Sequence, residues 1–333
     1  MLGVFIAWKR LSRRTEDLSR ELGLELLFIR DRLPYFKAFV NTATILREKK
    51  PRVVFIQLPQ GPLLAEVVMF SRLLKLSVVA DVHTGFIYPT AFKEVLLNKP
   101  FHSYLRFVRL VVAHNILERE LIVRKAGVLF EKSLVVYDPL PKPPQRLSKL
   151  AIEVDVENAI SLPASWSSDE PLDKVVEEFS KSRTSRELAL IITGSWKRNR
   201  ELYNKVNKVV GKLGKEKRVI LTGFIPDEEY WYLLKSCRAV IALTNREYTL
   251  PHAMWESVAV RKPFITARTR AIELELGSSY PCVFKPDLSD FAQALDKCLV
   301  EGESGRAVDA VENLALKSKQ SIEKLRRVIQ SLA

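Results

Sequence analysis

Residues 219–244, VILTGFIPDEEYWYLLKSCRAVIALT, contain the pattern that decides the fold. Runs rich in β-branched residues at 218–222 and 239–244 indicate two short strands, and the amphipathic stretch 227–237 between them indicates a helix. The strands are apolar without clean alternation, which is typical of a parallel sheet covered on both faces. The stretch therefore predicts one β-α-β unit of an α/β domain.

The same alternation extends along most of the chain in both directions. We expect further strands and helices at the following places: strands at 2–7, 24–29, 52–57, 77–81, 110–113, 133–137, 159–162, 188–193, 263–267 and 282–284, and helices at 35–49, 63–74, 169–180, 199–213, 252–260 and 288–299. In the helix 35–49 we expect the apolar face to contain Phe36, Phe39, Val40, Ala43 and Leu46. This order predicts two doubly wound parallel-sheet domains.

A proline-rich segment separates the two halves. Pro139, Pro141, Pro143 and Pro144 form a stiff connector. We therefore predict a first domain at 1–140, a linker at 141–150, a second domain at 151–305 and a C-terminal helix at 306–333. In such an arrangement a ligand binds at the carboxyl ends of the strands, in a cleft that the two domains face.

Composition excludes several protein classes. The 333 residues are 47% hydrophobic and 28% charged, as in soluble globular proteins. No apolar run reaches the roughly 18 residues of a membrane-spanning helix, and we identify no signal peptide. The three cysteines, Cys237, Cys282 and Cys298, are too few for a disulfide framework or a cysteine-rich zinc site, and they fit a reducing cytoplasm.

The net charge of +14 is concentrated in the first half of the chain. Residues 1–150 contain 25 basic and 13 acidic side chains, a net of +12. This excess favours an anionic partner for the first domain: nucleic acid, an anionic membrane surface or a phosphorylated substrate. The alternative is a charge that serves solubility alone.

Small, hydroxyl and charged residues follow the strands of the second domain and suit a nucleoside diphosphate. Lys197 and Arg198 would neutralise the diphosphate, and Glu256 would accept hydrogen bonds from ribose hydroxyls. The segment 249–251 precedes a helix, whose first N–H groups can hold a phosphate oxygen. The candidate donor-binding residues are Ser165, Gly194, Lys197, Arg198, Gly223, Phe224, Ile225, Thr249, Leu250, Pro251 and Glu256. The alternatives are an exposed basic helix start and a solvated glutamate.

The stretches 219–244 and 247–266 together resemble the donor domain of GT-B glycosyltransferases, especially the large retaining family four. The resemblance implies a GT-B fold with two Rossmann-like domains and a GDP- or UDP-linked sugar as the donor. It implies that Glu247 lies near the donor sugar and that Glu256 binds the ribose. It also implies that the backbone at Phe224 and Ile225 binds the base. The two glutamates are nine positions apart, one more than usual in that family, and Tyr248 and Thr249 replace its glycines.

A second resemblance lies in the first half of the chain. The segment 79–86, VADVHTGF, is similar to the Asp-Trp-His-Asn-x-Gly segment of the mannosyltransferases that extend dolichol-diphosphate chitobiose in N-glycan assembly. It implies transfer of a hexose, with mannose favoured, to a lipid-linked glycan precursor. It also implies inversion at the sugar, whereas the resemblance to family four implies retention.

His83 follows a predicted strand end, close to Asp81. An imidazole there can bind a sugar hydroxyl or act as a general base on an acceptor hydroxyl, with the carboxylate orienting it. We therefore assign His83, Asp81 and Glu247 as the candidate catalytic residues. The alternative for His83 is a structural histidine, and we expect less of His102, His114 and His252.

Two further groups in the first half are candidates for contact with an acceptor or a membrane. Lys9 and Arg10 follow the first strand, where their charges could bind a phosphate. Aromatic and basic residues also alternate between 86 and 109, which suits a helix at an anionic lipid surface, although a core helix with a charged face is an alternative. From this stretch we single out Phe86, Phe92, Lys93, Phe101 and Arg106.

These observations favour a metal-independent glycosyltransferase, since the chain contains no Asp-x-Asp motif. Its expected partners are a nucleotide sugar, a lipid-linked acceptor and an anionic membrane surface, but not nucleic acid. Its expected location is cytoplasmic and peripheral, at the inner face of the cell membrane. Two alternatives stay open: a nucleotide-sugar 2-epimerase and a non-catalytic basic protein that binds membranes or nucleic acid.

Overall fold

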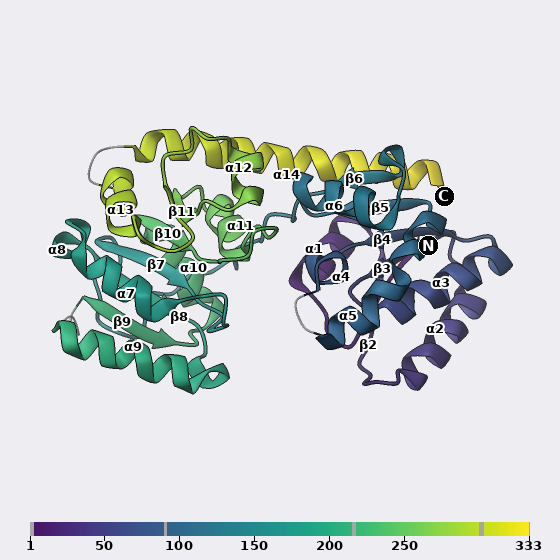
Figure 1. Ribbon diagram of the computed structural model, residues 1–333, viewed down its shortest axis with the longest axis horizontal. Coiled ribbons are helices and arrows are strands. Elements are labelled where there is room, and N and C mark those ends of the chain that lie inside the picture. The colour runs from purple at the N-terminus through teal and green to yellow at the C-terminus, as the bar shows by residue number, and fades with distance from the viewer. Residues whose placement is uncertain (1–2, 90–91, 215–217, 300–302, 333) are drawn as a thin grey trace. The chain divides into compact units, whose positions relative to one another are not determined.

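The chain divides into two compact units. The structure is a computed structural model that describes residues 3–89, 92–214, 218–299 and 303–332. Unit 1 comprises Met1–Pro139 together with Lys317–Ala333, and unit 2 comprises Leu140–Leu316. Each unit has its own sheet and its own core (Figure 1).

Within the described residues, each unit contains one six-stranded parallel sheet, so the prediction of two α/β domains is confirmed. The strand order is β2-β1-β3-β4-β5-β6 in unit 1 and β12-β11-β10-β7-β8-β9 in unit 2. The strands are β1 (Gly3–Trp8), β2 (Glu25–Ile29), β3 (Val53–Gln57), β4 (Ser77–Asp81), β5 (Leu110–Ala113), β6 (Ser133–Val135), β7 (Ala159–Pro163), β8 (Ala189–Thr193), β9 (Val219–Gly223), β10 (Ala239–Ala242), β11 (Phe264–Ala267) and β12 (Val283–Phe284).

Helices connect the strands, and several begin at polar residues that accept a backbone hydrogen bond. Ser12, Asn115, Asn199 and Thr269 each accept from an N–H three residues later, which satisfies one of the free donors of a helix start. The helices are α1 (Arg13–Leu22), α2 (Phe36–Lys49), α3 (Gly61–Leu74), α4 (Thr84–Ile87), α5 (Phe92–Asn98), η1 (Lys99–Phe107), α6 (Ile116–Ala126), η2 (Phe130–Lys132), α7 (Leu172–Lys181), α8 (Thr184–Glu187), η3 (Trp196–Arg198), α9 (Arg200–Leu213), α10 (Asp227–Ser236), α11 (His252–Ala259), α12 (Arg270–Leu276), α13 (Phe291–Leu299) and α14 (Ser304–Leu332).

The long helix α14, yellow in Figure 1, contributes to the core of unit 1. Ile322, Leu325 and Ile329 pack in the same buried cluster as Phe5 and Phe55 of the central strands. The helix is also tied by hydrogen bonds, since Ser318 Oγ donates to the carbonyl of Asp138 and Ser321 Oγ accepts from the N–H of Tyr137. Of the helix that we expected at 306–333, the part from Lys317 onward thus belongs to unit 1, and the part up to Leu316 belongs to unit 2.

The helix α2 exposes most of the face that we expected it to bury. Ala38, Thr42 and Leu46 are its buried residues, whereas Phe36 is 77% and Val40 63% exposed. The predicted apolar face was therefore right for Leu46 but wrong for Phe36, Phe39 and Val40, because the buried side of the helix runs through Ala38, Thr42 and Leu46. This leaves an apolar surface without a partner in the unit.

The stretch 86–109 is not one amphipathic helix. It forms the short segments α4, α5 and η1, and the lipid-facing helix expected there is absent from the described residues. Phe86 is fully buried, and its ring packs against His102 at 5.0 Å. Phe86 therefore belongs to the core and not to a membrane-facing surface.

Cys282 and Cys298 form a disulfide, which the cysteine count did not predict. The two residues are 16 positions apart, but the turn after β12 and the helix α13 bring their Cα atoms to 5.2 Å. Cys237 is free and buried. Among the described residues, no helix is both long and apolar enough to span a bilayer.

Candidate functional site

At the carboxyl end of β4, Asp81 is fully buried and bound to a buried arginine. Arg14, on α1, places Nη2 3.0 Å from Asp81 Oδ1 and Nη1 2.6 Å from Asp138 Oδ1. Arg14 Nη2 also donates to the carbonyl of Val136. Burial by itself would raise the pKa of Asp81, but the Arg14 cation and two neighbouring histidines hold that pKa well below its usual value. Asp81 is therefore a carboxylate at neutral pH.

Two histidines share this carboxylate. His83 Nε2 lies 3.4 Å from Asp81 Oδ2, and His114 Nε2 lies 3.6 Å from Asp81 Oδ1. The two rings meet edge to face at 4.6 Å. Burial and the nearby His114 lower the pKa of His83. The pKa of His114 is raised, since Glu118 and Asp81 outweigh the lowering by burial and by Arg14. A proton on the pair therefore favours His114 over His83, and the lowered pKa of His83 favours its neutral form.

Asp81, His83 and His114 could also offer three ligand atoms to a metal, because these atoms lie within 4.8 Å of one another. The Arg14 guanidinium, however, already binds Asp81 through Nε and Nη2. A second cation on the same carboxylate would meet that positive charge at short range. The donor set fits a metal by residue type but not by charge.

Lys9 and Arg10 are exposed in the loop that follows β1, at the same edge of the sheet as Asp81. Gln57 holds this loop, since its Nε2 donates to the carbonyl of Arg10 and its Oε1 accepts from the N–H of Ser12. The loop backbone is therefore fixed while both cationic side chains extend into solvent. Their expected contact with a phosphate stays a prediction.

The other residues expected at an acceptor or membrane surface divide by exposure. Phe92 is 81% exposed, and Lys93 is exposed beside it. Phe101 is half-buried and lies against Gly61, where an added Cβ would come within 2.3 Å of its ring. Arg106 is exposed but donates from Nε to the carbonyl of Ala126. Phe92 and Lys93 are the pair free to meet a partner.

In unit 2, the loops after β7, β8 and β9 are bound to one another. Trp166 Nε1 donates to the carbonyls of Thr193 and Gly194, and the N–H of Gly194 donates to the carbonyl of Gly223. Gly194 has a φ of +94°, and a Cβ there would lie 1.8 Å from the carbonyl oxygen of Ala164. No other residue fits at position 194, so the close approach of these loops depends on glycine.

Two acidic residues of the loop after β7 brace this edge of the sheet. Glu170 Oε1 accepts from the N–H and Oγ of Ser165, and burial raises the pKa of Glu170 above its ordinary value. Asp169 accepts from Arg246 Nη2 at 3.0 Å and from the hydroxyl of Thr244. Ser165 is therefore positioned, but its hydroxyl already has an internal partner.

The predicted diphosphate and base contacts are exposed at this edge. Lys197 and Arg198 lie in η3, and their side chains form no ion pair with any described residue. Phe224, directly after β9, is 78% exposed, and Ile225 is half-buried beside it. Free cations and an exposed ring suit a phosphate group and a base, respectively.

Glu256 is 7% exposed on α11 and is held by two side chains. Its Oε2 accepts a short hydrogen bond from the hydroxyl of Tyr230 on α10, and its Oε1 lies 3.5 Å from His252 Nε2. Thr249, Leu250 and Pro251 are half-buried or buried and lead directly into α11, as expected. Glu256 is thus a fixed acceptor one turn inside the helix whose start was predicted to bind phosphate.

Glu247 has a structural role that the sequence did not indicate. Its Oε2 accepts from the N–H of Arg270 at 3.0 Å, and its carbonyl accepts from the N–H of Ala271. Both bonds fix the start of α12, where helix donors need partners. Its expected place near the donor sugar stays a prediction.

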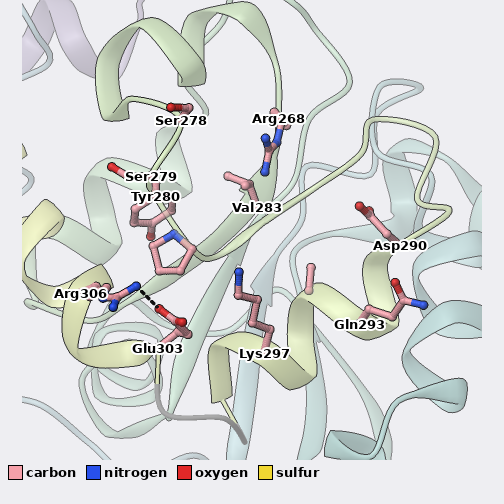
Figure 2. A pocket seen from close by; sticks show the side chains of 12 residues that line it. Arg268, Ser278, Ser279, Tyr280, Val283, Asp290, Gln293, Lys297, Glu303 and Arg306 are labelled. Carbon is pink, nitrogen blue, oxygen red and sulfur yellow. Dashed lines mark hydrogen bonds and ion pairs between the residues drawn. The ribbon is translucent and has the colours of Figure 1, made fainter.

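A polar hollow of about 430 Å³ lies beside β12, and the candidate donor residues do not line it. Figure 2 shows the Lys297 amine and the Arg268 guanidinium in this hollow, with Glu303 and Arg306 paired at its edge. Its remaining wall comes from α13 and the segment before β12. The hollow is thus separate from the predicted donor contacts.

Arg14 and Tyr230 were not predicted from the sequence, and less was expected of His114 than of His83. His114 directly follows the strand Leu110–Ala113. The expectation that sites form at the carboxyl ends of strands, which selected His83, could therefore have selected His114 too. Arg14 and Tyr230 lie within helices, at positions that local sequence does not distinguish from surface residues. Only the packing of α1 on β4 and of α10 on α11 gives them their partners.

Comparison with known proteins is consistent with this architecture. Residues 164–311 match the family model of glycosyl transferases group 1. No curated protein matches the chain.

Solved structures resemble both units together at low sequence identity. HepE of Anabaena in complex with UDP has a TM-score of 0.74 at 11% identity, covering 99% of this chain and 100% of its own. A glycosyltransferase from Rickettsia africae has a TM-score of 0.75 at 12% identity, covering 99% and 98%. The lipopolysaccharide outer core galactosyltransferase WaaB has a TM-score of 0.69 at 12% identity, covering 99% and 100%.

These matches confirm the GT-B fold and the glycosyltransferase prediction at the level of the domain. The family match covers the unit that carries Lys197 and Glu256, and the structural matches extend over both units. Residues 164–311 thus match the glycosyl transferases group 1 domain, and the chain has the GT-B fold.

Proposed function

We propose that the enzyme transfers a hexose, with mannose favoured, from a UDP- or GDP-linked sugar to a hydroxyl of a lipid-linked glycan precursor. The observation that carries this proposal is the cluster of Asp81, His83 and His114 at the carboxyl end of β4 and β5. The group 1 domain occupies unit 2, so unit 1 is left for the acceptor. A neutral histidine beside a carboxylate is the group that an acceptor hydroxyl requires.

In the proposed step His83 takes the proton of the acceptor hydroxyl. The hydroxyl oxygen then forms a bond to the anomeric carbon, while the bond from that carbon to the diphosphate oxygen breaks and its electron pair leaves with the diphosphate. Lys197 and Arg198 neutralise the leaving group, so the proposed reaction needs no metal. Asp81 stabilises the imidazolium that forms on His83.

His83 turns Nε2 toward Asp81, which leaves Nδ1 as its proton acceptor. A base that deprotonates the acceptor hydroxyl is typical of direct displacement of the diphosphate, so we expect inversion at the anomeric carbon. Replacing His83 with alanine should lower kcat about a hundredfold, within the range for a lost general base, and change the KM for the donor little. NMR of the product identifies the configuration at the anomeric carbon. A product with the same configuration as the donor contradicts the assignment of His83 as the base.

Three observations support the finer parts of the proposal. HepE has been solved with UDP and with UDP-glucose, which favours a UDP-sugar donor. WaaB acts on a lipopolysaccharide core by its name, which favours a lipid-linked acceptor. The net charge of +12 in residues 1–150 favours a peripheral location at the cytoplasmic face of the membrane.

The donor part is tested with a thermal-shift panel of UDP-, GDP- and dTDP-linked sugars, because a ligand bound only by the native state raises the Tm. Glu256→Ala should weaken binding of the preferred nucleotide about tenfold or more, since a buried, fixed acceptor is lost. Glu228→Ala, at an exposed position of α10, is the matched control. Equal affinity of the wild type and Glu256→Ala contradicts the assignment of Glu256.

Mass spectrometry of the products then tests transfer itself. A mass increase of one hexose on the acceptor supports the proposal. Conversion of the nucleotide sugar to an isomer of equal mass, without transfer, identifies a 2-epimerase instead.

A further inference from the structure

Helices α2, α3 and η1 enclose a groove of about 710 Å³ on unit 1. A groove of this size is within the range of small-molecule sites. Its wall is mainly apolar and includes Phe39, Met69, Leu73, Phe101, Tyr104 and Phe107. The groove lies on the exposed side of α2 and α3, away from Asp81 and His83, which do not line it.

Glu66 of α3 lines this groove and has no hydrogen-bond partner among the residues that the structure describes. Its side chain is 2% exposed, and both carboxylate oxygens are buried and unpaired. A buried polar group without a partner costs free energy in the unit by itself. Burial raises the pKa of Glu66 to about 8, so the group is a neutral acid at pH 7. A ligand that brings no charge and much apolar surface therefore fits the groove.

Large apolar side chains are also exposed on α2 and α3, which line the groove, and on α5. Phe36 and Val40 of α2, Leu73 of α3, and Phe92 and Leu96 of α5 are each more than 60% exposed. Soluble proteins rarely keep so many neighbouring apolar side chains in water without a partner. Each of these three helices thus exposes apolar surface in addition to the groove itself.

The same helices carry a positive charge at their exposed positions. α2, α3, α5 and η1 contain three acidic residues, Glu48, Glu66 and Glu94, of which Glu66 is neutral. Their basic residues are Lys37, Arg47, Lys49, Arg72, Lys93, Lys99 and Arg106. An apolar surface with surrounding cations is complementary to a bilayer with anionic headgroups.

We propose that the face formed by α2, α3, α5 and η1 docks onto an anionic phospholipid bilayer, and that the groove at Glu66 takes one hydrocarbon chain of a phospholipid. We call this face the docking face. The inference deepens the proposed membrane location and rests on it, and it places the contact on helices other than the stretch 86–109 that the sequence indicated. The basic residues of these four helices bind the headgroup phosphates, while Phe39, Met69 and Phe101 contact the hydrocarbon chain.

Docking should weaken at alkaline pH, because ionised Glu66 puts a charge inside the apolar groove. The other titratable groups that line the groove are Arg72 of α3 and Tyr104 of η1, and α2 contributes Phe39. The Arg72 guanidinium stacks over the Phe107 ring at 4.8 Å. Glu66 is therefore the carboxyl group whose ionisation changes the charge of the lining.

Flotation of the full chain with vesicles of equal parts phosphatidylcholine and phosphatidylglycerol tests the proposal. At about pH 7 we expect the wild type to float with these vesicles and much less with pure phosphatidylcholine. Met69→Asp and Leu73→Asp should each lower the partition coefficient about tenfold or more, since they put a charge into the apolar contact. Leu274→Asp, on α12 of unit 2 at 45% exposure, is the matched control and should leave it unchanged.

A second comparison isolates Glu66. On raising the pH to about 9.5, flotation of the wild type should fall several-fold, whereas Glu66→Gln should float equally well at both pH values. Glu66→Gln keeps the shape of the side chain, so its folding is not in question. Equal loss for both proteins overturns the role of Glu66 and of the groove.

The docking face is overturned if the wild type does not float, or if Met69→Asp, Leu73→Asp and Leu274→Asp behave alike. It is also overturned if the wild type is a dimer that these variants dissociate and that does not bind vesicles. The same samples are assayed for the thermal shift by UDP-sugars. Nucleotide binding without flotation refutes the docking face alone, and flotation without nucleotide binding refutes the proposed function alone.

Discussion

Two of the buried carboxyl groups in unit 1 have opposite properties, Asp81 at the sheet edge and Glu66 in the groove. Their side chains are 0% and 2% exposed, so burial is nearly the same. Asp81 has Arg14 at 3.0 Å and two histidines nearby, and its pKa is held well below the usual value. Glu66 has no hydrogen-bond partner in the described part of the chain, and burial raises its pKa to about 8. The difference shows that the partner, and not the depth of burial, decides the charge of a buried carboxyl group.

This contrast separates two kinds of surface on one unit. The sheet edge keeps a fixed charge and orients histidines, which suits polar chemistry at a hydroxyl. The groove excludes charge at neutral pH, which suits contact with an apolar chain.

Removing the cation at Asp81 should have the largest effect. We expect Arg14→Met to lower the free energy of unfolding by about 3–5 kcal/mol at pH 7, because it leaves a buried carboxylate without its partner. The loss of stability should shrink as the pH falls. Because the pKa of Asp81 is lower in the folded than in the unfolded state, its carboxylate stabilises the fold at pH values above the unfolded-state pKa, and protonation removes that contribution. Urea denaturation measures it, with Arg13→Met at an exposed position of the same helix as the control. Equal stability of both variants contradicts a central role for the ion pair.

Neutralising Glu66 should have a smaller effect of opposite sign. The folded pKa of about 8 lies above the unfolded value, so stability falls as the pH rises between the two values. We expect Glu66→Gln to raise the free energy of unfolding by roughly 2–3 kcal/mol at pH 7 and to have no effect near pH 4. Denaturation at both pH values measures this. A gain that does not depend on pH contradicts a raised pKa at Glu66.

The smallest effect should come from His114, which acts on His83 through charge. His114 lowers the pKa of His83, so His114→Asn should raise that pKa and move the acid limb of the kcat/KM profile to higher pH. Activity would then be lost at a higher pH than in the wild type, because His83 must be neutral to accept a proton. A shift to lower pH, or an unchanged limb, contradicts the coupling of the two histidines.

Much of the fold could be predicted from the sequence. The strands β4 and β5 have the predicted bounds, and the other strands differ from prediction by one or two residues at their ends. Short apolar runs separated by amphipathic stretches are a local signal, which a parallel sheet requires in every repeat. The expectation that ligands bind at the carboxyl ends of strands likewise selected His83, Asp81 and Lys197. These residues lie at or after a strand end whatever packs around the strand.

Other features depended on contacts between distant parts of the chain. The apolar face of α2 was expected in the core, but Ala38 and Thr42 face the unit instead, since the neighbours of a helix and not its own pattern set the buried side. The disulfide of Cys282 and Cys298 depends on how α13 packs beside β12.

The sequence by itself determined the two parallel sheets, the charge of the first half and the residues at the strand ends, because each of these depends on neighbours along the chain. Only the tertiary structure decided the charge state of those residues. Arg14 reaches Asp81 across 67 positions, and Ile322 enters the core beside Phe5, so electrostatics and packing here come from parts of the chain that local sequence does not relate. The same reason explains why Glu66, inconspicuous in the sequence, lies buried and unpaired in an apolar groove.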